Sequence, residues 1–275
     1  MKYAFKAAIL SAAVAVSGFA MPALAATTPS FTIDTGIFNY ATPDFSANFI
    51  NSTASTLITL NPNKINQTGK GYLTFDTFQS NGLNVGALDS GLNLSATSGY
   101  TLHAEFTYTL ALATGTYAAP GSTYNVTALN FSLYGEQSNG VANNSTFIKA
   151  DNTNPGSATV VQSADTKLLG TGGLVVGVST LNNLAGTSLN ATIDFALTND
   201  GKSFFVAPVP FYDLAFSSFT NTTNGFLVNP ATGLAEINNA SGGIDFNRVP
   251  EPTSVALLGL GLVALATSRR RRNVK

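Results

Sequence analysis

The most constraining feature of the chain is a strict alternation of side chains over thirteen residues, from Tyr100 to Leu112. Apolar side chains occupy the even-numbered positions, and polar or small ones occupy the odd-numbered positions. Because successive side chains of a β-strand point to opposite faces, this predicts a long strand with one face in a core and the other in water. The segment 123–134 continues the pattern, and the Gly- and Pro-containing stretch 115–121 predicts a hairpin turn between them.

Shorter segments with strand character recur along the rest of the chain. They lie at 31–34, 57–60, 69–78, 146–150, 167–180, 189–197, 204–206, 211–219 and 244–246. Asn199-Asp200-Gly201 predicts a further hairpin turn, and no segment between the strands has the pattern of an amphipathic helix. Many alternating strands separated by turn residues favour an all-β body, built as a two-sheet antiparallel β-sandwich or jelly roll.

The chain contains no cysteine, so a hydrophobic core rather than disulfide bonds must stabilise it. Its 275 residues include 19 Phe and 9 Tyr, which suffice for one sizeable domain. We assign residues 26–220 to this β-sandwich body and the polar segment 221–248 to a linker or cap.

The N-terminus has the three parts of a secretory signal peptide. Two lysines precede an apolar stretch over 7–20, which we expect to form a helix, and Ala23-Leu24-Ala25 supplies the small-x-small pattern of a cleavage site. We therefore expect signal peptidase to remove residues 1–25, so that the exported chain begins at Ala26.

The C-terminal segment 249–275 also has three parts in a fixed order. They are the motif Val249, Pro250, Glu251 and Pro252, an apolar run over 255–266, and the arginines Arg269, Arg270, Arg271 and Arg272. Pro252 suits the first turn of a helix, which we expect over 253–268. Such a helix is about 24 Å long, against a hydrocarbon core of roughly 30 Å. The segment therefore predicts a marginal membrane helix, suited to brief retention before cleavage, with the tail 269–275 as its stop.

Charge is segregated between the body and the tail. Between residues 26 and 249 there are 13 acidic and 6 basic residues, a formal charge of −7, whereas residues 269–275 carry +5. An acidic body lacks the electrostatic footprint of a nucleic-acid-binding protein. The basic tail fits the positive-inside rule and predicts that the body lies on the far side of the membrane.

The order of Val249-Pro250-Glu251-Pro252, an apolar segment and an arginine cluster resembles the PEP-CTERM sorting signal of Gram-negative bacteria. The resemblance implies recognition by an exosortase, an integral-membrane enzyme that processes such proteins. It further implies transient anchoring in the inner membrane, followed by delivery to the cell surface or the extracellular matrix. The resemblance covers about the last tenth of the chain. It concerns where the protein is delivered rather than what it does there.

A second resemblance rests on two short stretches, 225–230 and 241–248, together with overall size and Thr/Asn-rich β character. These are similar to the flocculation-associated PEP-CTERM proteins. This implies a structural or adhesive role in floc or biofilm formation, with exopolysaccharide as a partner.

No catalytic or metal-binding set stands out in the body. His103 is the only histidine, and its place on the polar face of its strand predicts a solvated side chain. We expect no metal or cofactor. Glycoside hydrolysis would need two suitably spaced carboxylates, and no pair is singled out among Glu105, Glu136, Asp194, Asp213 and Glu236.

Three functions therefore remain open. The first is a non-enzymatic structural or adhesive matrix protein, which we favour. The second is a β-sandwich that binds carbohydrate, or ice through its Thr-rich strands, of which Thr107-Tyr108-Thr109 is the clearest example. The third, a secreted glycoside hydrolase, is least favoured because the chain has no tryptophan to form a sugar-binding platform.

Overall fold

The computed structural model describes residues 29–61, 66–95, 97–138, 144–182, 186–220 and 226–247. Strands make up 64% and helices 6% of this part of the chain, so the all-β prediction is confirmed. The predicted signal-peptide helix within 1–25 and the predicted tail helix over 253–268 lie outside the described residues.

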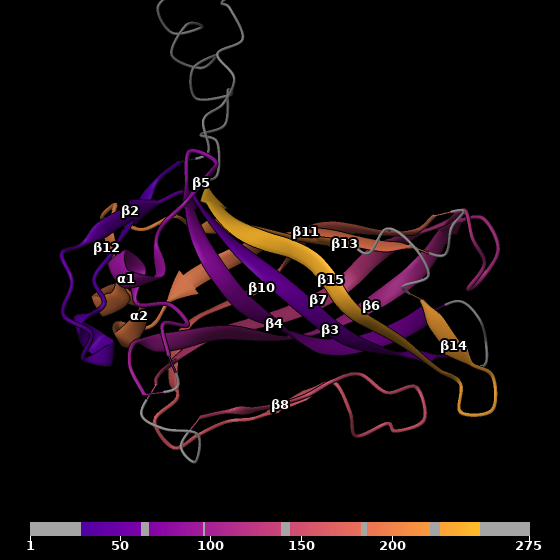
Figure 1. Cartoon of the computed structure of the whole chain (residues 1–275). Helices are drawn as coiled ribbons and strands as arrows, with labels where there is room; N and C mark the ends of the chain where they lie inside the picture. Colours follow the sequence, from indigo (N-terminus) through magenta and orange to yellow (C-terminus); the bar gives the residue numbers. More distant parts are fainter. Residues whose placement is uncertain are drawn as a thin grey trace, which may run out of the picture.

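Eight long strands form a single closed antiparallel barrel (Figure 1). They are β3 (Phe49–Leu60), β4 (Asn66–Ser80), β6 (Tyr100–Thr114), β7 (Ser122–Gln137), β10 (Lys167–Leu181), β11 (Thr187–Leu197), β13 (Leu214–Thr220) and β15 (Leu234–Asn247). Their order is β13-β11-β10-β7-β6-β4-β3-β15, and β13 pairs with β15 to close the ring. That closing pair runs from Leu214 opposite Asn247 to Thr220 opposite Ser241.

The closed ring replaces the two-sheet sandwich that the sequence predicted. Inward and outward side chains alternate in the same way in both architectures, so the pattern could not separate them. Register shifts interrupt the ladders on β3, β6, β10 and β15, for example between Asn51 and Ser52 and between Leu174 and Val176. Such bulges bend a strand and increase its twist, which favours closure of the sheet on itself.

Side chains fill the interior of the barrel. An eight-stranded barrel is just wide enough for its inward side chains to meet, so it holds a packed core. Leu102, Leu133 and Ile193 are fully buried there. Tyr108 packs over Gly69, where a Cβ atom would lie 2.1 Å from the tyrosine ring, so this strand position requires glycine.

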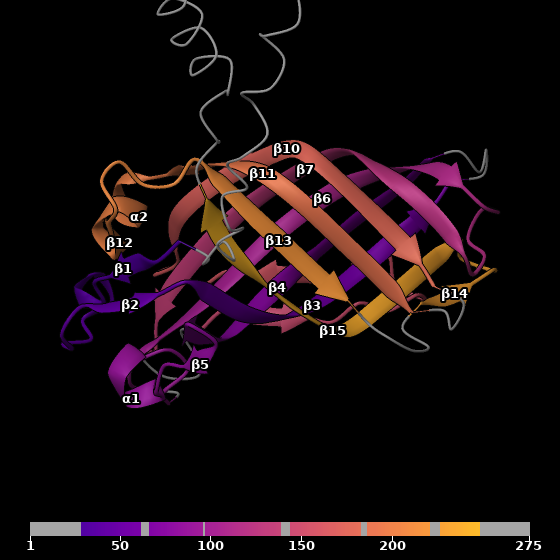
Figure 2. The same cartoon turned by 90° about the horizontal axis from the view of Figure 1, so that it is seen from above.

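One end of the barrel, which we call the capped end, is covered by short elements (Figure 2). They are β1 (Phe31–Ile33), β2 (Phe45–Ala47), β12 (Phe205–Ala207), the 3₁₀ helix η1 (Gly36–Phe38), α1 (Ala87–Ser90) and α2 (Asn199–Phe204). β1 pairs with both β2 and β12 in a three-stranded sheet. Aromatic rings join these covering elements to the barrel: Phe31 of β1 contacts Phe246 edge to face at 5.2 Å, and Phe38 of η1 stacks on Tyr100 at 5.0 Å.

The Asn199-Asp200-Gly201 segment begins α2 and does not form the predicted hairpin turn. Thr198 is the N-cap of this helix, and its Oγ1 atom accepts a hydrogen bond from the N–H of Gly201 at 3.0 Å. The turn prediction was wrong because Asn and Asp suit helix starts as well as turns. Here the N-cap hydrogen bond of Thr198 favours the helix.

Residues 144–166 form an outer arm that runs along the outside of the barrel (Figure 1). The arm contains β8 (Thr146–Ile148) and β9 (Thr159–Val161), which pair only with each other. Two further short strands, β5 (Leu83–Asn84) and β14 (Leu227–Asn229), pair with β4 and β15 respectively.

The segment 221–248 is not the linker or cap that the sequence suggested. Its described part contains β14 and β15, and β15 is a wall strand paired to β3 on one side and β13 on the other. The prediction was wrong because β15 is polar and contains Gly242 and Gly243, which hid its strand character.

Candidate functional site

A polar cleft of about 660 Å³ opens at the capped end, between β7, β10, η1 and α2. It is lined by Ile37, Phe38, Asn39, Gln137, Ala164, Asp165, Thr166, Lys167, Leu168 and Asp200. Its volume falls within the range of roughly 300–1,000 Å³ that is usual for small-molecule sites. Amide, carboxylate and ammonium groups dominate the lining, so the cleft suits a ligand rich in hydrogen-bonding groups.

Asn39 and Gln137 form one wall of the cleft. Asn39 follows η1 with a left-handed backbone (φ 54°), a conformation that Asn tolerates better than most residues. Its N–H donates to the carbonyl of Gly36 at 2.9 Å, which ends the helix. Its Nδ2 donates to Oε1 of Gln137 at 2.9 Å, so the two amides are held side by side.

Asp200 also lines the cleft, from the first turn of α2. The helix is fixed to β10 because Thr198 donates from Oγ1 to the carbonyl of Leu168 and from N–H to that of Leu169. Gly201 is required at this contact, since a Cβ atom there would lie 1.8 Å from the carbonyl oxygen of Leu169. The carboxylate of Asp200 is therefore carried on a firmly attached element.

Residues 164–168 also line the cleft and include the last residues of the outer arm. A buried carboxylate holds this arm in place. Glu136 accepts hydrogen bonds from the N–H and Oγ of Ser145 (the latter at 2.7 Å), from Ser163 Oγ at 2.8 Å and from Thr166 and Thr101. Burial alone would raise the pKa of Glu136, but these hydrogen bonds outweigh it and hold the pKa below its usual value. The glutamate is thus ionised and anchors the arm.

The other end of the arm is clamped to β3 and β15. Ser55 accepts a hydrogen bond from the N–H of Ala150 at 2.8 Å, and Asn238 donates to the carbonyl of Ala150 at 2.9 Å. Oε2 of Glu236 accepts from the N–H of Asn152 at 2.7 Å. Leu57 and Leu234 pack beneath this clamp with Ala150 in a small apolar cluster outside the barrel.

His103 is buried beneath the arm and is not the solvated side chain that the sequence predicted. Its ring stacks on Tyr134 at 5.2 Å and meets Phe147 of the arm edge to face at 5.4 Å. The side chain is 0% exposed, and neither ring nitrogen has a hydrogen-bond partner within the described residues. Burial lowers the pKa of His103 to about 4, against a smaller opposing effect of Glu136. The alternation correctly placed His103 outside the barrel, but it carried no information about the arm.

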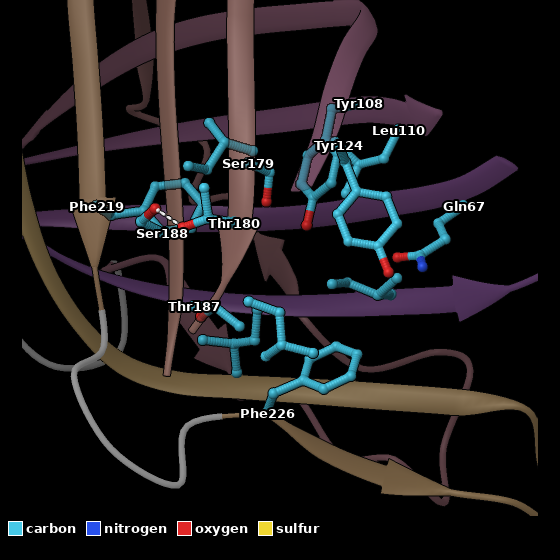
Figure 3. A pocket seen from close by; sticks show the side chains of 14 residues that line it. Gln67, Tyr108, Leu110, Tyr124, Ser179, Thr180, Thr187, Ser188, Phe219 and Phe226 are labelled. Carbon is cyan, nitrogen blue, oxygen red and sulfur yellow. Dashed lines mark hydrogen bonds between the residues drawn. The ribbon is translucent and has the colours of Figure 1, made fainter. Parts of the chain in front are cut away.

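Side chains inside the barrel surround a small cavity of about 20 Å³ (Figure 3). Tyr108, Tyr124 and Phe226 are among the side chains around it, and Gln67 Nε2 and Thr187 Oγ1 are buried there without a hydrogen-bond partner in the described structure. This volume suits a single water molecule rather than a larger ligand. The cleft at the capped end is therefore the better candidate site.

Four of the five carboxylates considered for a glycosidase accept hydrogen bonds within the fold. Glu136 and Glu236 serve the two ends of the outer arm, Glu105 accepts from Gln162 of the same arm, and Asp194 accepts from the N–H of Gly173. Groups of three or more His, Asp or Glu side chains that could hold a metal are not found within the described residues. The cleft residues were missed in the sequence because they come from four separate segments.

The sorting residues Val249, Pro250, Glu251 and Pro252, the arginines 269–272 and the predicted cleavage site around Ala25 all lie outside the described residues. Among the described helices, none has the length and apolar character needed to cross a membrane.

The fold and the charge pattern thus define an all-β barrel followed directly by a C-terminal signal. Residues 248–272 match the family model of the PEP-CTERM protein-sorting motif, which confirms the resemblance seen in the sequence. The chain therefore carries a PEP-CTERM sorting motif, which indicates an exported protein targeted to an exosortase and implies transient anchoring in a membrane before surface display. Searches of curated proteins and of solved structures found no match to the chain.

Proposed function

We propose that the barrel is a non-enzymatic, structural or adhesive protein of the extracellular matrix that contacts exopolysaccharide through the cleft at the capped end. The cleft carries the proposal, because it is roomy, polar and built from well-anchored side chains. Side-chain amides and carboxylates both accept hydrogen bonds from sugar hydroxyls, and amides also donate. Signal peptidase and the inner membrane of a Gram-negative cell belong to the same proposal, as the route by which the chain reaches the matrix.

The filled barrel supports a structural role over a carrier or catalytic one. A barrel that transports a small molecule needs an internal space for it, whereas the cavity among the described interior side chains measures about 20 Å³. Four of the five carboxylates considered for hydrolysis hold the outer arm or a neighbouring strand. The biofilm and flocculation role rests on this reasoning and on the weaker resemblance of the segments 225–230 and 241–248.

The cleft can be tested with the purified body and exopolysaccharide from the producing bacterium. The double substitution Asn39→Ala and Asp200→Ala should weaken binding at least about tenfold, since loss of one or two polar contacts costs roughly 1–3 kcal/mol. The control is Asn125→Ala with Asp44→Ala, which removes the same groups at exposed positions that do not line the cleft. Equal binding by both variants would overturn the proposal, as would unchanged cell aggregation after deletion of the gene.

One observation favours ice binding as a second candidate. Threonines lie opposite one another on three neighbouring strands of the outer wall, Thr59 on β3, Thr68 on β4 and Thr109 on β6. They line a shallow hollow of about 290 Å³ that also includes Thr107 and Lys70. Thermal hysteresis measured on the wild type and on Thr68→Val would test ice binding. If this face binds ice, the wild type shows thermal hysteresis and Thr68→Val shows less.

A further inference from the structure

The three most exposed large apolar side chains of the described structure all lie at the capped end. They are Leu83 of β5 at 75%, Leu88 of α1 at 73% and Val209, between β12 and β13, at 87% exposure. β5 continues the sheet from the last residues of β4, and α1 follows it. Val209 precedes β13, whose first residue pairs with Asn247.

The chain leaves the barrel at the same end. β15 finishes at Asn247, and the sorting motif begins at the next residue. The predicted membrane helix begins at Thr253, so six Cα-to-Cα steps separate it from the barrel wall. Even fully extended, these span at most roughly 20 Å. The capped end is therefore held close to the membrane while the tail is inserted.

This tether also sets the distance to the lipid headgroups. The polar headgroup region adds roughly 5–8 Å to each side of the hydrocarbon core. A barrel held within about 20 Å of the core boundary therefore rests on or beside that region. Because the tether keeps the local concentration of lipid high, even weak apolar contacts suffice for docking.

We propose that the capped end is a membrane-docking surface, and that Leu83, Leu88 and Val209 insert into the headgroup region while the precursor is anchored. Leu83 lies on β5 beside β4, Leu88 follows in α1, and Val209 lies in the segment that leads into β13, while the tail leaves from β15, which stands between β13 and β3 in the ring. The polar cleft lies elsewhere on the ring, beside β7 and β10. The inference rests on the sorting motif and is independent of polysaccharide binding.

The negative charge of the capped end determines which lipids favour docking. The carboxylates Asp44, Asp89 and Asp213 lie in or beside the same short elements at this end. They would repel an anionic bilayer. Docking should therefore be stronger on zwitterionic vesicles than on vesicles that contain phosphatidylglycerol.

The absence of cysteine makes a direct test possible, because each introduced thiol is unique. The full-length precursor carrying Leu83→Cys, Leu88→Cys or Val209→Cys would be labelled with a polarity-sensitive fluorophore and reconstituted by its tail into phosphatidylcholine vesicles with a lipid-borne quencher. Val175→Cys on the wall and Leu227→Cys on β14 are matched controls, at 55% and 50% exposure.

Docking predicts at least about threefold stronger quenching and a blue-shifted emission at the three capped-end positions, and a smaller effect with 30% phosphatidylglycerol. Equal quenching at all five positions would overturn the proposal. So would quenching that arises only after exosortase is added, since the surface would then belong to an enzyme interface. Polysaccharide is absent from this experiment, so its outcome is independent of the cleft.

Discussion

At the scale of single residues, two neighbouring titratable groups under the outer arm are stabilised in opposite ways. Glu136 is kept ionised by hydroxyl and N–H donors, whereas His103 is kept neutral by aromatic neighbours and lacks a hydrogen-bond partner in the described structure. Burial costs a charged group its hydration unless other groups replace it, and only Glu136 has such groups. The two groups therefore have different roles. The carboxylate of Glu136 attaches the arm, whereas the imidazole of His103 is only covered by it.

The first prediction concerns the pH dependence of stability. His103 binds its proton with a pKa of about 4 in the fold and 6.5 in the unfolded chain. Because the unfolded state binds more protons between these values, stability should fall as pH drops from about 6.5 to 4. The full difference is about 3 kcal/mol. Loss of the Glu136 interactions adds to this only at lower pH, as its depressed pKa is approached.

His103→Phe should remove this dependence and keep the contacts with Tyr134 and Phe147. Denaturant unfolding at pH 7, 5.5 and 4.5 would measure it, with Thr107→Ala, an exposed position on the same strand, as the control. A variant whose stability falls with pH as steeply as that of the wild type would show that His103 is not the group responsible.

At the scale of elements, β15 decides the architecture. It is the last strand among the described residues, yet it pairs with β3 near the beginning and with β13. Gly242 permits the second pairing, because a Cβ atom there would lie 1.8 Å from the carbonyl oxygen of Ser218 on β13. A larger residue must push the two strands apart at the place where the ring closes.

The second prediction follows from that contact. Gly242→Ala should destabilise the body by at least about 2 kcal/mol, because backbone cannot yield as a flexible side chain can. Ser241→Ala is a suitable control, since Ser241 is the adjacent, exposed residue of the same strand. Thermal unfolding would measure both variants, and hydrogen exchange should show faster exchange along β13 and β15 in Gly242→Ala alone. Equal stability of the two variants would contradict the role of Gly242 in closure.

At the scale of the whole molecule, the barrel and the sorting segment are directly joined. The motif begins one residue after the barrel wall ends, so the exosortase must act close to the capped end. Removal of the tail would release that end from the membrane.

The third prediction tests the sorting segment in the producing bacterium. Glu251→Ala, or deletion of Arg269 to Arg272, should leave a precursor that is unprocessed or mislocalised. Mass spectrometry of the C-terminus and cell fractionation would measure this, with Asn273→Ala, outside the matched residues 248–272, as the control. A wild-type protein that still ended at Lys275 after export would contradict processing.

Local patterns in the sequence sufficed to predict the long strands and the sorting motif. The alternation from Tyr100 to Leu112 predicted β6 and its hairpin with β7, because side-chain orientation in a strand depends only on neighbours along the chain. The sorting motif was likewise a contiguous segment. Such features depend on interactions within a few residues.

The tertiary structure alone decided the closed ring, the burial of His103 and the cleft. Barrel closure depends on twist, bulges and the pairing of β13 with β15, none of which changes the alternation of side chains. His103 is covered by Phe147, 44 residues away in the chain, and the cleft joins Asn39, Gln137, Lys167 and Asp200. These features arise from contacts between segments distant in sequence, and a pattern read along one segment carries no information about its partner.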